Sequence, residues 1–240
     1  MATPALATHP KIILFTDFDG TVTAQDSNDF LTDNLGFGVK KRKELGKQVI
    51  DGTLHFRDAF QQMLDSIDTP FDKCAEALLE NIELDSGFKD FYFWSRENNV
   101  PVVVVSSGME PLIRKLLAKL VGDAANDIQI IANHVDVKPD GSWSIVFRDP
   151  ESGFGHDKAK SIRPYAEKSD RPFLLYAGDG ISDLSAAKET DLLFAKNGCD
   201  LVDYLEKNKI PYNGFDSYND ISKAIKKLHN EEVALDALRG

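Results

Sequence analysis

Apolar residues along the chain concentrate in four short runs, each ending in small or acidic residues. The runs occupy residues 11–15, 100–108, 172–180 and 192–198, and helix-like periodicity follows each of them. Strands that are apolar throughout, alternating with helices, are typical of a parallel sheet covered on both faces. We therefore predict an α/β fold with a doubly wound, mostly parallel, Rossmann-like sheet.

Two stretches depart from this alternation. Between residues 22 and 99 no strong strand occurs, and apolar residues repeat at helical spacing in 56–67 and 71–82. We expect a helical insert over 22–99, which leaves 1–21 and 100–240 for the core domain. Residues 128–148 alternate between apolar and polar and contain Asp140-Gly141, which predicts a small β-hairpin.

Charge and composition narrow the function classes. The chain has 240 residues and is 42% hydrophobic, which is enough to build a core. Its net charge of −11 repels nucleic acid and anionic membranes, so neither is an expected partner. An anionic substrate would need a local cation or metal to reverse that field. The start lacks signal-peptide features, and two cysteines far apart suit a reducing compartment, so we expect a cytoplasmic protein.

The first apolar run ends in DFDGT, which carries Asp17 and Asp19. Along an extended backbone these two carboxylates project to the same side, at the strand end where open α/β sheets bind ligands. Paired carboxylates repel each other unless a cation intervenes, and Mg²⁺ prefers oxygen ligands. The alternatives are a plain polar turn or a calcium loop.

Three further motifs follow other strands. GDGISD supplies Asp179 and Asp183, SSG supplies Ser106 and Ser107, and GHDK supplies Lys158 at a helix start. Hydroxyl groups at a strand-to-helix junction can bind phosphate, and a lysine opposed to the helix dipole suggests an anionic partner. The alternatives are helix capping for Asp183, a simple turn for SSG and a solvated surface residue for Lys158. Taken together, these residue types suit phosphoryl transfer, which needs a nucleophile, a metal and cationic donors.

DFDGT, Ser106, Lys158 and GDGISD occur in an order and spacing that resemble the four motifs of the haloacid dehalogenase-like hydrolases. The likeness covers nearly the whole chain, and the helical insert resembles that superfamily's cap domain. Within it, TDFDGTVTAQDSNDFLTD, VVVVSSGM and FGHDKAKSI are similar to the phosphoserine-phosphatase-like branch, above all to fungal polyol and sugar-phosphate phosphatases.

The resemblance implies a role for each motif residue. Asp17 would be the nucleophile, and Asp19 would protonate the leaving alcohol and then activate water. Asp17, the carbonyl of Asp19 and Asp179 would hold Mg²⁺. The remaining expected roles are orientation of the metal shell by Asp183 and phosphate binding by Ser106, Ser107 and Lys158. Ser107 stands where the family often has glycine, so the choice between the two serines stays open.

Substrate selection is expected from residues beside the motifs and on the cap. The candidates are Asp26, Ser27, Asn28, Arg57, Met109, Glu110 and His156. Asp26, Ser27 and Asn28 could bond a hydroxyl-rich substrate, but the same residues are also favoured helix caps.

The leading hypothesis is a Mg²⁺-dependent phosphatase that hydrolyses a small phosphorylated metabolite, a sugar or polyol phosphate, as a monomer or homodimer. A phosphoserine or methionine-salvage phosphatase is the first alternative, with Arg57 as the cation for a carboxylate. A phosphotransferase or mutase is the second. A non-catalytic binding protein on the same fold is disfavoured because all four motifs are intact.

Overall fold

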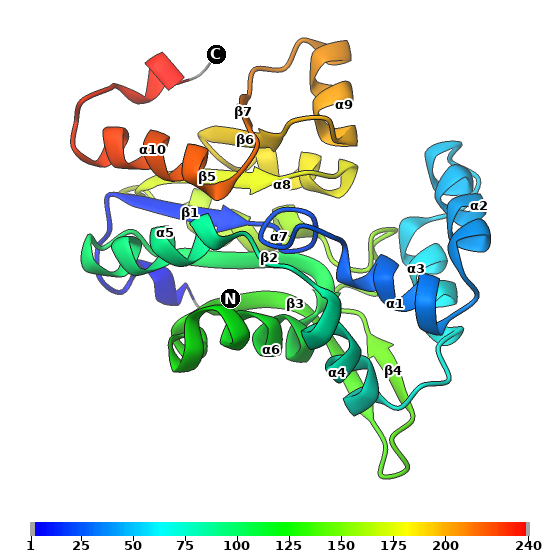
Figure 1. Cartoon of the computed structure of the whole chain (residues 1–240). Coiled ribbons are helices and arrows are strands. Elements are labelled where there is room, and N and C mark those ends of the chain that lie inside the picture. The colour runs from blue at the N-terminus through cyan, green and yellow to red at the C-terminus, as the bar shows by residue number, and fades with distance from the viewer. Residues whose placement is uncertain (1–2, 239–240) are drawn as a thin grey trace.

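The computed structural model describes residues 3–238 and contains one seven-stranded sheet (Figure 1). The strand order is β4-β3-β2-β1-β5-β6-β7, and every pair is parallel except β3 with β4. The strands are β1 (Ile12–Thr16), β2 (Val102–Met109), β3 (Gln129–Val137), β4 (Trp143–Val146), β5 (Phe173–Gly178), β6 (Leu192–Lys196) and β7 (Asn213–Phe215). This confirms the predicted mostly parallel, doubly wound α/β fold.

The chain winds outward from β1 in two directions, through β2 and β3 and then through β5 and β6. The carboxyl ends of β1, β2 and β5 therefore meet at the point where the strand order reverses, which is where ligands bind in such sheets. β7 was not predicted, because its three residues are too few to show any periodicity.

Ten α-helices surround the sheet within residues 3–238. They are α1 (Ser27–Leu35), α2 (Val39–Ile50), α3 (Phe56–Asp65), α4 (Phe71–Asn81), α5 (Ser86–Glu97), α6 (Glu110–Val121), α7 (Lys158–Ala166), α8 (Leu184–Ala187), α9 (Asp200–Asn208) and α10 (Tyr218–His229). None of the helices in this part of the chain is long and apolar enough to cross a membrane.

Alternate residues of β1 serve the two faces of the sheet. Ile12 and Leu14 join a core cluster with α5, α6 and α10, whereas Ile13 and Phe15 join a second cluster with α7, α8 and α9. Because both faces are covered, β1 is buried at all five positions. This explains why the strand is apolar throughout rather than alternating.

The helical insert leaves and re-enters the core at one place. Thr23 and Leu84 form an isolated antiparallel bridge, so the two ends of the segment lie side by side. α1, α2 and α3 project beyond the sheet edge, with α2 outermost (Figure 1). α5, which also falls within the predicted insert of 22–99, packs against α10 and α6 of the core. The predicted domain boundaries stay a prediction.

The expected hairpin is present as β3 and β4. Its turn places Gly141 at φ +87°, and the Asp140 carboxylate accepts a hydrogen bond from the Ser142 amide at 2.9 Å. Trp143 at the start of β4 donates from Nε1 to the Thr69 carbonyl at 3.0 Å, so the hairpin supports the connection between α3 and α4.

Candidate active site

Asp17 stands directly beyond β1 and continues its pairing with β5. Its amide donates to the Ala177 carbonyl at 2.8 Å, and its Oδ1 accepts from the Phe18 amide at 2.7 Å. The Phe18 ring is fully buried, whereas Asp17 and Asp19 are each 7% exposed. Phe18 thus packs into the core as expected, whereas the chain already turns at Asp19, because the Val22 amide donates to the Phe18 carbonyl at 2.8 Å.

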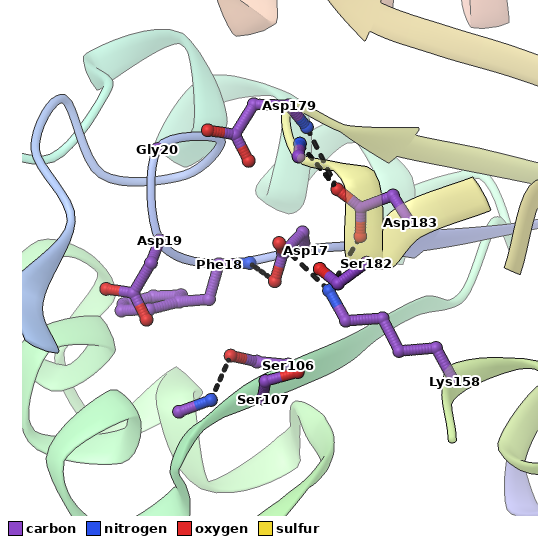
Figure 2. Close-up of polar contacts among 12 residues, drawn as sticks. Asp17, Phe18, Asp19, Gly20, Ser106, Ser107, Lys158, Asp179, Ser182 and Asp183 are labelled. Carbon is purple, nitrogen blue, oxygen red and sulfur yellow. Dashed lines mark hydrogen bonds and ion pairs between the residues drawn. The ribbon is translucent and has the colours of Figure 1, made fainter. Parts of the chain in front are cut away.

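Lys158, the first residue of α7, is 1% exposed and lies between two carboxylates (Figure 2). Its Nζ is 2.9 Å from Asp17 Oδ2 and 2.6 Å from Asp183 Oδ1. Burial by itself would lower the pKa of Lys158, but the charges of Asp17 and Asp183 outweigh it and raise that pKa above its usual value. The structure thus excludes the alternative of a solvated surface lysine.

Asp183 is fully buried and uses both carboxylate oxygens as acceptors. Oδ1 accepts from Lys158 and from the Tyr176 hydroxyl, each at 2.6 Å, and Oδ2 accepts from the amides of Asp179 and Gly180, each at 3.0 Å. Asp183 therefore fixes both the lysine and the loop that carries Asp179. Asp183 therefore has the capping role that was the alternative to a site role, and it also contacts the site residue Lys158.

Asp17, Asp179 and Asp183 each offer an oxygen within 4.8 Å of the others. Burial raises the pKa of Asp17 to about 7, although the charge of Lys158 opposes this, and burial followed by repulsion from Asp17 and Asp183 raises the pKa of Asp179 to about 8. The Asp179 carboxylate accepts no hydrogen bond from any described residue, and its Oδ2 lies where a Cβ on Gly20 would have to be, at 2.1 Å. A hard cation fits this cluster, because it would relieve the repulsion and complete Asp179.

Asp19 lies apart from the Asp17–Lys158–Asp183 group and faces the start of α1 (Figure 2). Its Oδ1 accepts from the Ser27 amide at 2.8 Å, and its Oδ2 accepts from Asn28 Nδ2 at 3.0 Å. Burial, followed by the charge of Asp26, raises the pKa of Asp19 well above its usual value. A carboxyl in this environment can hold a proton near neutral pH.

The two serines at the end of β2 differ in their bonding. Ser106 Oγ accepts from the Gly108 amide at 2.9 Å. Ser107 Oγ is buried and has no hydrogen-bond partner among residues 3–238, while its carbonyl accepts from Asn133 Nδ2 at 2.7 Å. Both serines line the same cavity, so the choice of phosphate ligand between them stays open.

His156 does not reach that cavity and instead supports β2 from behind. Nδ1 lies 2.7 Å from the Ser106 carbonyl and Nε2 lies 2.8 Å from Ser161 Oγ. Burial lowers the pKa of His156 to about 4, so the ring is neutral near pH 7. A carbonyl can only accept, so Nδ1 donates and Nε2 accepts from the serine hydroxyl. In this structure His156 holds the Ser106 carbonyl, and its expected contact with substrate stays a prediction.

A cavity of about 610 Å³ separates the strand ends from the helical insert. Its core wall includes Asp17, Asp19, Ser106, Ser107, Gly108 and Asp179, and its wall on the insert includes Asp26, Asn28, Asp29, Arg42, Lys43, Gly46, Lys47, Val49, Ile50, Phe56, Ala59, Phe60 and Met63. Asp26 caps α1, accepting from the amides of Asn28 and Asp29, and also faces the cavity.

Four other specificity candidates lie away from this cavity lining. Ser27 is buried under Asp19, and Met109 is 1% exposed in the core. Glu110 pairs with Arg114 at 2.6 Å. Arg57 bonds Asp58 and the Pro150 carbonyl, because α3 turns it toward the loop after β4. None of these four side chains lines the cavity, and their contact with substrate stays a prediction.

Several cavity residues escaped the sequence analysis. Asp29 and Arg42 form an ion pair, and Lys43 and Lys47 stand one turn apart on α2. The basic run KKRK at residues 40–43 is unusual in a chain of net charge −11, and it could have indicated a site for an anionic group. Lys196 at the end of β6 is outside the cavity lining and donates to the Gly20 carbonyl at 2.5 Å, so it supports the turn after Asp19.

The family pattern of haloacid dehalogenase-like hydrolases matches residues 14–188. This chain belongs to that family. Among its relatives, the polyol phosphate phosphatase PYP1 of Saccharomyces cerevisiae is 50% identical, covering 91% of this chain and 94% of the relative. Pdp3-interacting factor 1 of Schizosaccharomyces pombe is 49% identical, covering 93% and 98% respectively.

Solved structures of this family share the fold. A substrate-bound phosphoserine phosphatase superposes with a TM-score of 0.67 at 20% identity, covering 90% of this chain and 97% of that one. Similarity at this level of identity supports the architecture of this hydrolase, and its substrate has to be argued from the cavity itself.

Proposed function

We propose that this hydrolase is a Mg²⁺-dependent phosphatase that cleaves a sugar or polyol phosphate through an aspartyl-phosphate on Asp17. The carrying observation is the buried Asp17–Lys158–Asp183 group facing the unpartnered carboxylate of Asp179 at the end of β5. The 50% identical relative named as a polyol phosphate phosphatase supports the substrate class.

In the first half-reaction, an oxygen of Asp17 attacks phosphorus and the bond to the leaving alcohol breaks. The alkoxide takes a proton from Asp19, whose raised pKa favours the protonated form. Lys158 and the hydroxyl groups of Ser106 and Ser107 neutralise and orient the phosphoryl oxygens. The products are the free alcohol and phosphorylated Asp17.

In the second half-reaction, the ionised Asp19 takes a proton from water as the water oxygen attacks phosphorus. The bond between phosphorus and Asp17 breaks, which releases inorganic phosphate and restores the carboxylate. Asn28 and the Ser27 amide hold Asp19 at the start of α1 for both transfers.

The implied metal has a suitable donor set. Asp17, Asp179 and the carbonyl of Asp19 would hold Mg²⁺, with Asp183 orienting Asp179 through its amide. When bound, Mg²⁺ lowers the repulsion between the phosphoryl group and these carboxylates.

The wall on the insert supports a hydroxylated tail better than a carboxylate. Asp26 and Asp29 are acidic acceptors at the start of α1, and Arg57, the cation expected for phosphoserine, bonds the Pro150 carbonyl instead. The cations of this wall, Arg42, Lys43 and Lys47, lie on α2. The two cysteines, Cys74 and Cys199, are free thiols, which supports a cytoplasmic location. We propose that the protein acts as a monomer or a homodimer.

Asp17→Asn tests the nucleophile. We expect turnover of p-nitrophenyl phosphate with Mg²⁺ to fall by roughly 10⁴-fold or more. The near-isosteric amide keeps the far-UV circular dichroism spectrum and the cooperative unfolding. Asp19→Asn is the matched variant: it retains the nucleophile, so acid quenching should trap phosphorylated protein from Asp19→Asn and none from Asp17→Asn. Near-normal turnover by Asp17→Asn would refute the assignment.

A further inference from the structure

The wall of the cavity on the insert holds a charged cluster that the chemistry of the phosphoryl group does not use. Arg42 Nη1 lies 2.5 Å from Asp29 Oδ2. The same guanidinium donates to both oxygens of Asp33, through Nε at 2.7 Å and Nη2 at 2.8 Å. Asp29 and Arg42 line the cavity, and Asp33 does not. One guanidinium is therefore shared by a carboxylate inside the cavity and another outside it.

The helix that carries Asp29 also carries the partners of Asp19. Asp26 and Asp29 are three residues apart at the start of α1, so they lie on one face of the helix. Asn28 between them bonds Asp19 at 3.0 Å. A substrate tail that leaves the phosphorus near Asp19 would therefore meet this turn of α1 and then Arg42 on α2.

Asp29 has acceptor capacity left over. Its Oδ2 pairs with Arg42, and its Oδ1 accepts no hydrogen bond from another residue within 3–238. Burial, followed by the charge of Asp26, raises the pKa of Asp29 to about 7, although Arg42 opposes this. The Asp29 side chain is 36% exposed, so its remaining acceptor capacity is open to solvent and to a substrate group in the cavity.

Hydroxyl groups match such a pair better than an anion does. A hydroxyl donates to a carboxylate oxygen and accepts from a guanidinium, and an Asp–Arg pair offers both. A carboxylate at this turn of α1 would instead face Asp26 and Asp29 beside a guanidinium already bound by Asp33, whereas the other cations of the wall, Lys43 and Lys47, are exposed on α2. The site would therefore reject a carboxylate-bearing substrate by charge repulsion, in addition to binding a hydroxylated substrate by hydrogen bonds.

We propose that Asp29 and Arg42 bind hydroxyl groups of the leaving alcohol and so select a polyol chain over a carboxylate-bearing one. This inference rests on the proposed phosphatase function. Asp33 is assigned the role of holding Arg42 in place, without contact with substrate.

The test compares Asp29→Asn with Asp33→Asn, because each removes one negative charge beside Arg42. The substrates are sorbitol 6-phosphate, p-nitrophenyl phosphate, whose tail has no hydroxyl, and phosphoserine. We expect Asp29→Asn to lower the ratio of kcat/KM for sorbitol 6-phosphate to that for p-nitrophenyl phosphate about tenfold, through KM. Asp33→Asn should move the ratio less than about threefold, and Asp29→Asn should raise relative activity on phosphoserine.

Two results would overturn the inference. If both variants changed the ratio of kcat/KM values equally, the Arg42 cluster would only hold α1 and α2 together and would not bind substrate. An unchanged ratio in Asp29→Asn would remove Asp29 from substrate recognition. Wild-type protein that hydrolyses no phosphomonoester at all would instead refute the proposed function, and this inference with it. Thermal unfolding of both variants checks that the cap is folded.

Discussion

The two walls of the cavity are built differently. Directly behind the core wall, Lys158 is 1% exposed and bonded to two carboxylates, and Asp183 accepts four hydrogen bonds. On the insert, Ile50 is 78% exposed, and Lys43 and Lys47 project into open space at the cavity rim. The buried charges behind the core wall are held by several hydrogen bonds each, whereas α2 is joined to α1 by the ion pairs of Arg42 with Asp29 and Asp33.

This difference separates chemistry from selection. Groups that handle charge in the reaction need fixed positions in a low-dielectric setting, which requires burial and many hydrogen bonds. Groups that choose the leaving alcohol can sit on a loosely packed helix, where substitution disturbs little else. Substitutions on the core wall should therefore have large effects and those on the insert small ones.

Lys158→Gln should produce the largest effect. It leaves Asp17 and Asp183 buried without a cation, so we expect loss of activity and a decrease in unfolding free energy of roughly 3–5 kcal/mol. In Lys158→Gln/Asp183→Asn the uncompensated charge is smaller, so stability should partly return while activity stays lost. Urea unfolding and turnover of p-nitrophenyl phosphate measure both. Recovery of activity in the double variant would contradict a role for Lys158 in charge neutralisation.

Two glycine-to-alanine substitutions compare the walls directly. A Cβ on Gly108 would lie 2.9 Å from Asp19 Oδ2 and 3.2 Å from Ser106 Oγ, so both must shift and kcat should fall about tenfold. A Cβ on Gly46 in α2 meets nothing within 4 Å, so Gly46→Ala should stabilise the protein by up to about 1 kcal/mol. Its kcat should stay within about twofold of wild type. A similar loss of kcat in both variants would mean that the walls do not differ as described.

The pH dependence of stability reports on the carboxylate cluster. Asp17 and Asp179 have folded-state pKa values of about 7 and about 8, above the ordinary 3.8. Their stabilising contribution in metal-free protein is therefore complete below pH 3.8 and is lost as pH rises through those values. His156, with its pKa lowered to about 4, acts in the opposite sense between 6.5 and 4.

Asp179→Asn isolates this effect, because His156 is the same in both proteins. Between pH 5 and pH 8 the metal-free variant should lose less stability than metal-free wild type. Added Mg²⁺ should raise the melting temperature of wild type more at pH 8 than at pH 6, and that of the variant little at either pH. Equal shifts by Mg²⁺ in both proteins would remove Asp179 from the metal site.

The cations of α2 should give the smallest effect. α2 contains five of the basic residues of a chain whose net charge is −11, and Lys43 and Lys47 line the cavity. Lys43→Gln/Lys47→Gln should lower kcat/KM about two- to fivefold at low salt and less at high salt, because the pair attracts an anionic substrate. Lys40→Gln/Lys41→Gln changes the charge equally away from the cavity lining, so a matching loss in that control would point to net charge alone.

The sequence was most informative where a local hydrophobic pattern follows directly from the burial of one element. β1, β2, β5 and β6 are buried on both faces, and such strands stand out as apolar runs. β7 and the pairing of α5 with α10 had no such signal, because a three-residue strand and a helix packed on another helix depend on distant partners. Arg57 shows the same limit, since its neighbour Phe56 lines the cavity while Arg57 turns to Pro150.

By itself, the sequence determined the α/β class, the hairpin and the residue types at the strand ends, because strand periodicity, turn chemistry and motif spacing are local properties. Tertiary structure decided that Lys158 is buried between Asp17 and Asp183, that His156 serves Ser106, and that Asp29 and Arg42 face the cavity. These contacts join residues from separate elements. Their distances follow from how helices dock on the sheet, which no single segment encodes.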